Sequence, residues 1–173
     1  DGKLLVDGVN ANSLSAEESA DGVYRVNWIS ASGTEVDITE DISSGSLKSL
    51  IDLRDNQVTA FIDDMNDLAE SLANEVNSIH STGYTATGVT GINFFQSKTT
   101  AQDYAAIMDI SDEVAASEEY VAATSSAVST SGNETALAIA ELGSASVTID
   151  GESTTYTDYC ASILSEIGGL SEN

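Results

Sequence analysis

The period of the hydrophobic pattern changes along the chain, from two before residue 45 to three and four after it. Residues 24–28 and 36–38 alternate between apolar and polar side chains, which is typical of strands with one buried face. The segment 30–34 between them contains a glycine, so the two runs predict an antiparallel hairpin. The polar stretch 10–22, rich in Ser and Glu, is expected to be a loop.

The strongest periodic signal lies after residue 45. Apolar residues recur at spacings of three and four from Leu47 to Ile79, and no glycine or proline interrupts them before Gly83. This pattern predicts a helix over 47–80, about 51 Å long at 1.5 Å per residue. A helix of that length is typical of a bundle or coiled coil. The serines just before it can cap its first turn.

Short elements are predicted in the rest of the chain. They are a strand at 107–110, one or two helical turns at 117–123, a helix at 134–142, a hairpin turn at 150–151 and a helix from 157 that is interrupted at 168–169. The chain as a whole is therefore expected to be α+β, with a core of long helices and small antiparallel β-hairpins.

Composition and charge exclude several classes of protein. The chain of 173 residues has 29 acidic and 5 basic side chains, a net charge of −24, which opposes binding to nucleic acids and to anionic membranes. No apolar run is long enough to cross a membrane. Cys160 has no second cysteine for a disulfide, and together with His80 it supplies too few ligands for zinc. The absence of proline suits a long unbroken helix.

The acidic clusters are the first candidates for chemistry. Asp63 and Asp67 share a helix face and could form a weak cation site, but a solvated acidic face is the favoured interpretation. No cluster has the residue order of a calcium loop, so we expect no metal and no cofactor. An acid-type hydrolase could still use two carboxylates, such as Asp37 and Asp109.

Other catalytic groups are scarce. His80 is the only histidine and falls in the last turn of the predicted helix, where capping or packing is favoured over catalysis. Cys160 is interpreted as a small packing residue. Arg54 leaves two alternatives open: a forked pair with a carboxylate on a neighbouring segment, or a surface pair with Asp55. No catalytic residue is predicted, so the protein is expected not to be an enzyme.

An ordered set of residues between 45 and 95 carries a family resemblance. Its members are Gly45, Leu47, Leu50, Arg54, Asp55, Leu68, Ala69, Leu72, Asn77, His80, Gly83, Gly88, Gly91, Phe94 and Phe95. This set resembles the flagellar hook-associated protein 1 family, the hook–filament junction protein. The segments 3–8, 132–142 and 155–169 also resemble the family, and the middle segment 97–131 matches more loosely.

The resemblance implies a structural, non-enzymatic subunit that joins hook to filament in the bacterial flagellum. Such proteins are secreted by type III export, lie outside the cell and serve flagellum assembly and motility. The implied partners are the hook protein, the second hook-associated protein and further copies of the same chain, with no nucleic acid and no membrane. The chain opens at Asp1, so we expect a central fragment whose terminal coiled-coil segments are missing.

The resemblance and the pattern together suggest three parts. Residues 1–95 are expected to form a β-hairpin and the long helix, 96–131 a small variable lobe, and 132–173 a return segment whose last helix packs on the long one. An extracellular adhesin or carbohydrate-binding module remains an alternative for an acidic chain rich in Ser and Thr.

Overall fold

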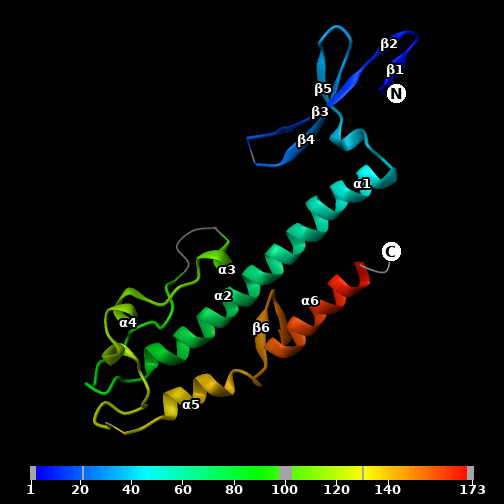
Figure 1. The fold of residues 1–173 in the computed structure, drawn as a ribbon. Coiled ribbons are helices and arrows are strands. Elements are labelled where there is room, and N and C mark those ends of the chain that lie inside the picture. The colour runs from blue at the N-terminus through cyan, green and yellow to red at the C-terminus, as the bar shows by residue number, and fades with distance from the viewer. Residues whose placement is uncertain (1–2, 21, 98–102, 130, 171–173) are drawn as a thin grey trace. The chain divides into compact units, whose positions relative to one another are not determined.

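The computed structural model describes residues 3–20, 22–97, 103–129 and 131–170, and shows an α+β protein (Figure 1). A long helix is accompanied by small antiparallel sheets, as the sequence predicts. The chain divides into two compact units, residues 1–57 and 58–173. The three-part division at 95/96 and 131/132 stays a prediction. Within the described ranges, no helix is both long and apolar enough to span a membrane.

The first unit is built mainly from short antiparallel strands. They are β1 (Val6–Asp7), β2 (Asn10–Ala11), β3 (Ser13–Glu18), β4 (Tyr24–Ile29) and β5 (Glu35–Asp37). β1 pairs with β2, and β4 lies between β3 and β5, with Trp28 opposite both Leu14 and Val36. The predicted β4–β5 hairpin is confirmed.

The expectation of a loop at 10–22 is wrong. β2 and β3 both lie in this stretch, and β3 pairs with β4 along its whole length. Its side chains are almost all exposed, so the strand is held by backbone hydrogen bonds and buries little apolar surface. Hydrophobic alternation is therefore too weak there to reveal the strand.

Helical backbone runs from Gly45 to Thr82 in three consecutive segments. These segments are α1 (Gly45–Asp52), the π-helical η2 (Leu53–Val58) and α2 (Thr59–Thr82). A short 3₁₀ turn, η1 (Thr39–Asp41), precedes them. The prediction of a long helix is confirmed. Ser44 precedes α1, but its side chain makes no capping hydrogen bond, so the capping expectation is wrong at that residue.

The second unit returns along α2 through short elements. They are α3 (Tyr104–Ile107), α4 (Asp112–Ala116), η3 (Glu118–Tyr120), α5 (Glu134–Glu141), β6 (Val147–Ile149), β7 (Glu152–Thr154) and α6 (Tyr156–Leu170). The core of this unit lies between α2, α5 and β6, around Val76, Leu142, Val147 and Ile149.

Two local predictions in this unit are wrong. At the expected strand 107–110 the helical turn α3 ends at Ile107, and the only pairing is an isolated bridge between Ile110 and Phe95. The glycines Gly168 and Gly169 do not interrupt α6, because glycine inside a helix costs only about 1 kcal/mol. The β6–β7 hairpin is confirmed.

Hydrogen bonds join α6 and β6 to α2. The Tyr159 hydroxyl donates to Asp64 Oδ1 at 3.2 Å, and Ser71 Oγ donates to the Thr148 carbonyl at 3.1 Å. Burial, together with the Asp64 carboxylate, raises the pKa of Tyr159 to about 12. The Tyr159 hydroxyl therefore remains a donor throughout the neutral range, and the side chain also packs on the core.

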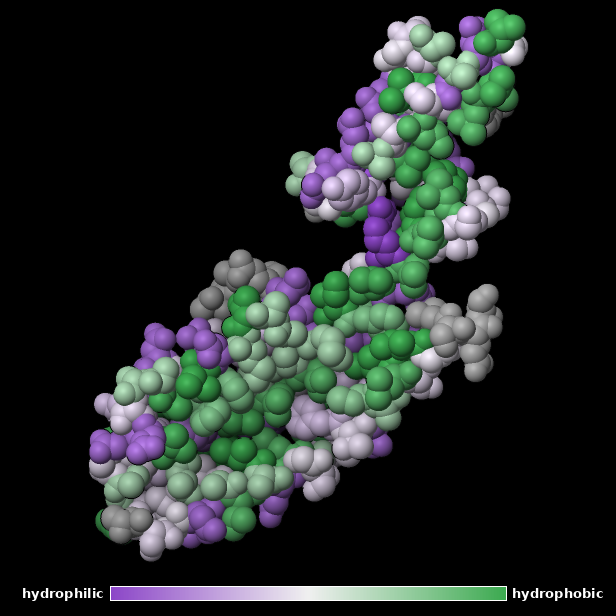
Figure 2. All heavy atoms as spheres, viewed as in Figure 1, coloured by the Kyte–Doolittle hydropathy of each residue, from purple (hydrophilic) through white to green (hydrophobic). Residues whose placement is uncertain are grey.

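Part of the apolar surface of the second unit stays exposed. Ile62 on α2 and Leu164 on α6 are 45% and 68% exposed, although the helical periodicity predicts that both face inward. Hydrophobic side chains accordingly reach the surface of this unit in the space-filling view (Figure 2). The apolar stripe of α2 is buried only toward its C-terminal end, where Ala73, Val76 and His80 are covered.

The net charge of −24 predicts that salt stabilises the chain. Counterions screen repulsion between carboxylates, and the Debye length falls from about 30 Å at 0.01 M to about 3 Å at 1 M. We expect the midpoint of thermal unfolding to rise as sodium chloride increases from about 0.01 M to about 0.5 M. Circular dichroism melts measure this midpoint, and one that stays constant contradicts the prediction.

Candidate functional site

Two buried polar side chains mark the C-terminal end of α2. Asn77 and His80 are 8% and 1% exposed, and their spacing of three places them on one face of the helix. The loop that ends at Phe95 and the segment around Ala122 lie against this face. We call Asn77, His80 and their backbone partners the Asn77–His80 cluster; the partners belong to Ile92, Phe95 and Ala122.

Both ring nitrogens of His80 are engaged. Nε2 lies 2.8 Å from the Ala122 backbone nitrogen and accepts its N–H, so Nε2 carries no proton. Nδ1 lies 2.8 Å from the Ile92 carbonyl oxygen and donates to it, which defines the neutral tautomer. The ring also meets Phe94 edge-on, with the centroids 5.4 Å apart. His80 therefore joins two distant segments to α2 and has no free nitrogen for proton transfer.

The Asn77 side chain forms hydrogen bonds with both backbone groups of Phe95. Its Nδ2 donates to the Phe95 carbonyl at 3.0 Å, and its Oδ1 accepts the Phe95 N–H at 2.8 Å. A planar amide offers a donor and an acceptor side by side, as this pairing requires. Within the described residues, every buried side-chain nitrogen and oxygen has a hydrogen-bond partner.

Two glycines allow the segments around the cluster to pack closely against the end of α2. A Cβ on Gly83 would lie 2.6 Å from the Thr135 side chain, so α5 could not pack at its present distance from the end of α2. Gly91 has a φ of +84°, and its N–H donates to the Ser81 carbonyl at 2.9 Å. Tyr84 and Thr124 then form an antiparallel bridge that closes the same end of the unit.

The remaining family-pattern residues lie in two places. Leu68, Leu72, Phe94 and Phe95 pack against the core of the second unit. The first unit holds Gly45, Leu47, Leu50, Arg54 and Asp55, whereas Ala69 and Gly88 belong to the second unit.

Arg54 combines features of both alternatives that the sequence left open. Its Nε and Nη2 donate to the two carboxylate oxygens of Asp55, at 2.5 and 2.9 Å. Its Nη1 donates to the Tyr24 carbonyl of β4 at 2.6 Å. The forked partner is thus the adjacent residue, and the contact with another segment is made with a backbone oxygen. The guanidinium hydrogen bonds hold the pKa of Asp55 below its usual value.

A comparison with known protein families identifies the region that contains the family-pattern residues. The family model described as "Flagellar hook-associated protein FlgK helical domain" matches residues 1–95, more than half of the chain. The chain belongs to the FlgK family. The matched region includes Asn77, His80 and the loop as far as Phe95. No significant match was found among curated proteins or among solved structures.

Membership of the FlgK family assigns a hook-associated structural role in the bacterial flagellum. The family is a structural one that assembles with other axial components of the flagellum. In this FlgK-family chain the Asn77–His80 cluster joins the end of the long helix to the loops that follow it.

The carboxylates considered for hydrolysis have other partners in the FlgK-family chain. Asp37 belongs to the first unit and Asp109 to the second. Hydrogen bonds from the Thr39 backbone and hydroxyl lower the pKa of Asp37, whereas a general acid needs a raised one. Asp109 accepts the Ile110 N–H at 2.8 Å.

The helix-face acids Asp63 and Asp67 lie near other carboxylates. Burial, followed by the negative charges of Asp150 and Asp63, raises the pKa of Asp67. In the described ranges, no three or more His, Cys, Asp or Glu side chains are grouped so that they could hold a metal ion. Cys160 is exposed, so the interpretation of it as a packing residue is wrong.

We expect Asp67→Asn to stabilise the FlgK-family chain at pH 7, by about 0.5 kcal/mol. A raised pKa in the folded state means that the ionised form destabilises the fold, so this variant removes an unfavourable charge. The gain should decrease as the pH falls toward 4 and disappear below about pH 3, where the aspartate is protonated in both states.

Urea denaturation across this pH range measures the effect of Asp67→Asn, with Asp41→Asn as the control. Asp41 is an exposed aspartate of the first unit, and its substitution changes the net charge equally. Equal stabilisation by both variants would show that the total charge, rather than the local surroundings of Asp67, is responsible.

The backbone partners in the cluster could not be found from the sequence. His80 and Asn77 stand out because polar residues interrupt an apolar stripe. Their partners are main-chain groups of Ile92, Phe95 and Ala122, and every residue type but proline carries both such groups. The nearest sequence signal is the series of glycines between residues 83 and 91.

Proposed function

We propose that this chain is part of a structural subunit that joins hook to filament in the bacterial flagellum. The observation that carries the proposal is the FlgK helical-domain match over residues 1–95. The ordered set of residues that resembles the junction protein, from Gly45 to Phe95, lies within the same region. The proposed location is extracellular, reached by type III export, and the proposed partners are the hook protein, the second hook-associated protein and further copies of the chain.

The hydrogen bonds of the Asn77–His80 cluster suit a structural element that has to resist local opening. Four hydrogen bonds from two side chains fix the end of α2 to segments 12 to 42 residues away in sequence. Such bonds oppose local opening of loops that would otherwise separate from the helix. The proposed role of the family-pattern residues is therefore to stiffen the domain.

The same arrangement supports a non-catalytic role. The single histidine has both nitrogens bonded to backbone, and Asp37, one of the two carboxylates considered for hydrolysis, has a lowered pKa. We further propose that the chain has three parts. Residues 1–95 form the β-hairpin and long helix, 96–131 a variable lobe, and 132–173 the returning segment.

Filament growth on isolated hooks tests the proposal. Hooks from cells that lack their junction protein are mixed with the full-length protein containing this sequence, the second hook-associated protein and filament subunits. We expect filaments to form only when the full-length protein is present. Failure of a correctly folded full-length protein to bind the hooks and restore growth would overturn the junction assignment.

A further inference from the structure

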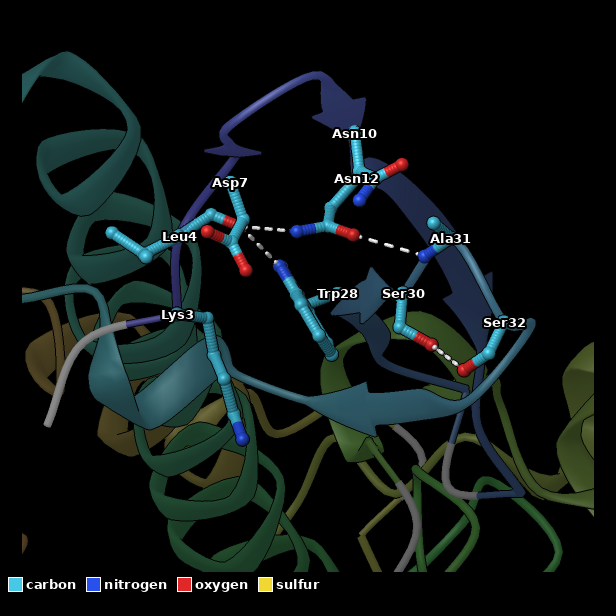
Figure 3. Close-up of a pocket in the computed structure, with 9 residues that line it drawn as sticks. All are labelled: Lys3, Leu4, Asp7, Asn10, Asn12, Trp28, Ser30, Ala31 and Ser32. Atoms are coloured by element: carbon cyan, nitrogen blue, oxygen red, sulfur yellow. Dashed lines mark hydrogen bonds between the residues drawn. The ribbon is translucent and has the colours of Figure 1, made fainter.

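A hollow of about 470 Å³ lies in the first unit, between the β1–β2 hairpin and the β4–β5 loop (Figure 3). Its volume is within the range of about 300 to 1,000 Å³ that is usual for small-molecule sites. Trp28 of β4 forms part of the wall, and Lys3, Asp7, Asn10 and Ser30 add polar groups. The residues that line this hollow lie outside the Asn77–His80 cluster.

The wall of the hollow is held by hydrogen bonds between its two sides. The Leu4 carbonyl accepts from Trp28 Nε1 at 2.9 Å and from Asn12 Nδ2 at 2.7 Å. Asn12 Oδ1 in turn accepts the Ala31 N–H at 2.9 Å. These three bonds fix the N-terminal hairpin against the sheet and so define the wall of the hollow.

Several polar groups at the hollow remain available to a ligand. The Lys3 ammonium, the Asp7 carboxylate and the Asn10 amide form no side-chain hydrogen bond with the described residues. Lys3 Nζ lies 5.3 Å from the centroid of the Trp28 ring, and the lysine is exposed. Lys3 therefore shields one face of the Trp28 ring only weakly, since an exposed cation–π contact is worth only about 0.5–1 kcal/mol.

The charge of the hollow indicates the kind of ligand. One lysine and one aspartate line it, so their formal charges cancel, although the whole chain carries −24. Because the two lining charges cancel, the hollow favours a neutral ligand over an anion or a cation. The aromatic ring, carboxylate, amide and hydroxyls together offer an apolar face beside donors and acceptors, which complements the C–H face and the hydroxyl edge of a sugar ring.

We propose that the hollow bounded by Trp28, Asp7 and Asn10 binds a neutral carbohydrate unit. The sugar displaces Lys3 from the Trp28 face and lays its C–H face on the indole. Asp7 accepts hydrogen bonds from the sugar hydroxyls, and the Asn10 amide both donates to them and accepts from them. This proposal goes beyond the proposed junction role, and it rests on residues of the first unit that differ from those of the Asn77–His80 cluster.

Tryptophan fluorescence tests the proposal directly, because Trp28 is the only tryptophan of the chain. The complete 173-residue chain is titrated separately with methyl β-glucopyranoside, methyl β-galactopyranoside and N-acetylglucosamine. We expect a saturable change in Trp28 emission with at least one of these sugars. A linear response to all three sugars would overturn the proposal.

Variants separate binding in the hollow from binding elsewhere. Asp7→Ala and Asn10→Ala each remove a proposed sugar contact at an exposed position, and we expect each to weaken binding about fivefold or more. Asp41→Ala removes an exposed aspartate of the same unit outside the hollow and should leave the affinity unchanged. Equal affinities in all three variants would contradict the assignment of the site.

Discussion

His80→Phe is expected to lower the free energy of unfolding of the second unit by about 3 kcal/mol. Phenylalanine retains an aromatic ring beside Phe94 but has no nitrogen to bond the Ile92 carbonyl or the Ala122 N–H. The Ala122 N–H would then lose its partner in a buried site, and the Ile92 carbonyl would lose its partner in a partly buried one. Each such group costs about 1–3 kcal/mol, more than the added apolar surface returns.

Urea denaturation of the His80→Phe variant measures this loss, with Ser78→Ala as the control. Ser78 lies two residues away on α2 and is exposed. Its replacement should change the stability by no more than about 0.5 kcal/mol. If His80→Phe is as stable as Ser78→Ala, the hydrogen bonds of His80 do not stabilise the fold.

Asn77→Ala is expected to destabilise the second unit by about 2–3 kcal/mol. The substitution removes both hydrogen bonds to Phe95 and leaves a small cavity on a buried helix face. The higher helix propensity of alanine offsets only a few tenths of a kcal/mol of this loss. Amide hydrogen exchange should also show faster exchange at the Phe95 N–H, which loses its acceptor.

Asn74→Ala is the matched control for Asn77→Ala. Asn74 is an exposed asparagine on the same helix, so its replacement gains the same helix propensity and loses no buried hydrogen bond. We expect it to be neutral or slightly stabilising. A similar loss of stability in both variants would show that a general effect on α2, and not the pairing with Phe95, is measured.

The fold could be predicted from the sequence wherever burial is periodic. The long helix, the β4–β5 hairpin and the β6–β7 hairpin each have a regular apolar pattern or a turn signal, and all are present. β3 was missed because its side chains are exposed and its pairing is made by backbone. The strand expected at 107–110 failed because three apolar residues interrupted by Asp109 are too short a pattern to specify a strand, and only Ile110 forms a bridge there.

The candidate site was only half visible in the sequence. Asn77 and His80 were predicted as members of the family pattern, and the burial of His80 agrees with the packing role expected for it. The groups that they bind are main-chain atoms 12 to 42 residues away, which no side-chain pattern reveals. Arg54 likewise binds a backbone oxygen of β4, so a search for a carboxylate partner across the chain could not find it.

The ring nitrogens of His80 provide the most direct test of the central claim, that this residue is a structural link and not a proton-transfer group. His80 is the only histidine, so ¹⁵N-detected correlation spectra of the imidazole have a single source. We predict a protonated Nδ1 and an unprotonated Nε2, with a hydrogen-bond coupling between Nε2 and the Ala122 amide. A ring with the proton on Nε2, or one whose two nitrogens exchange protons rapidly with solvent, would contradict the account.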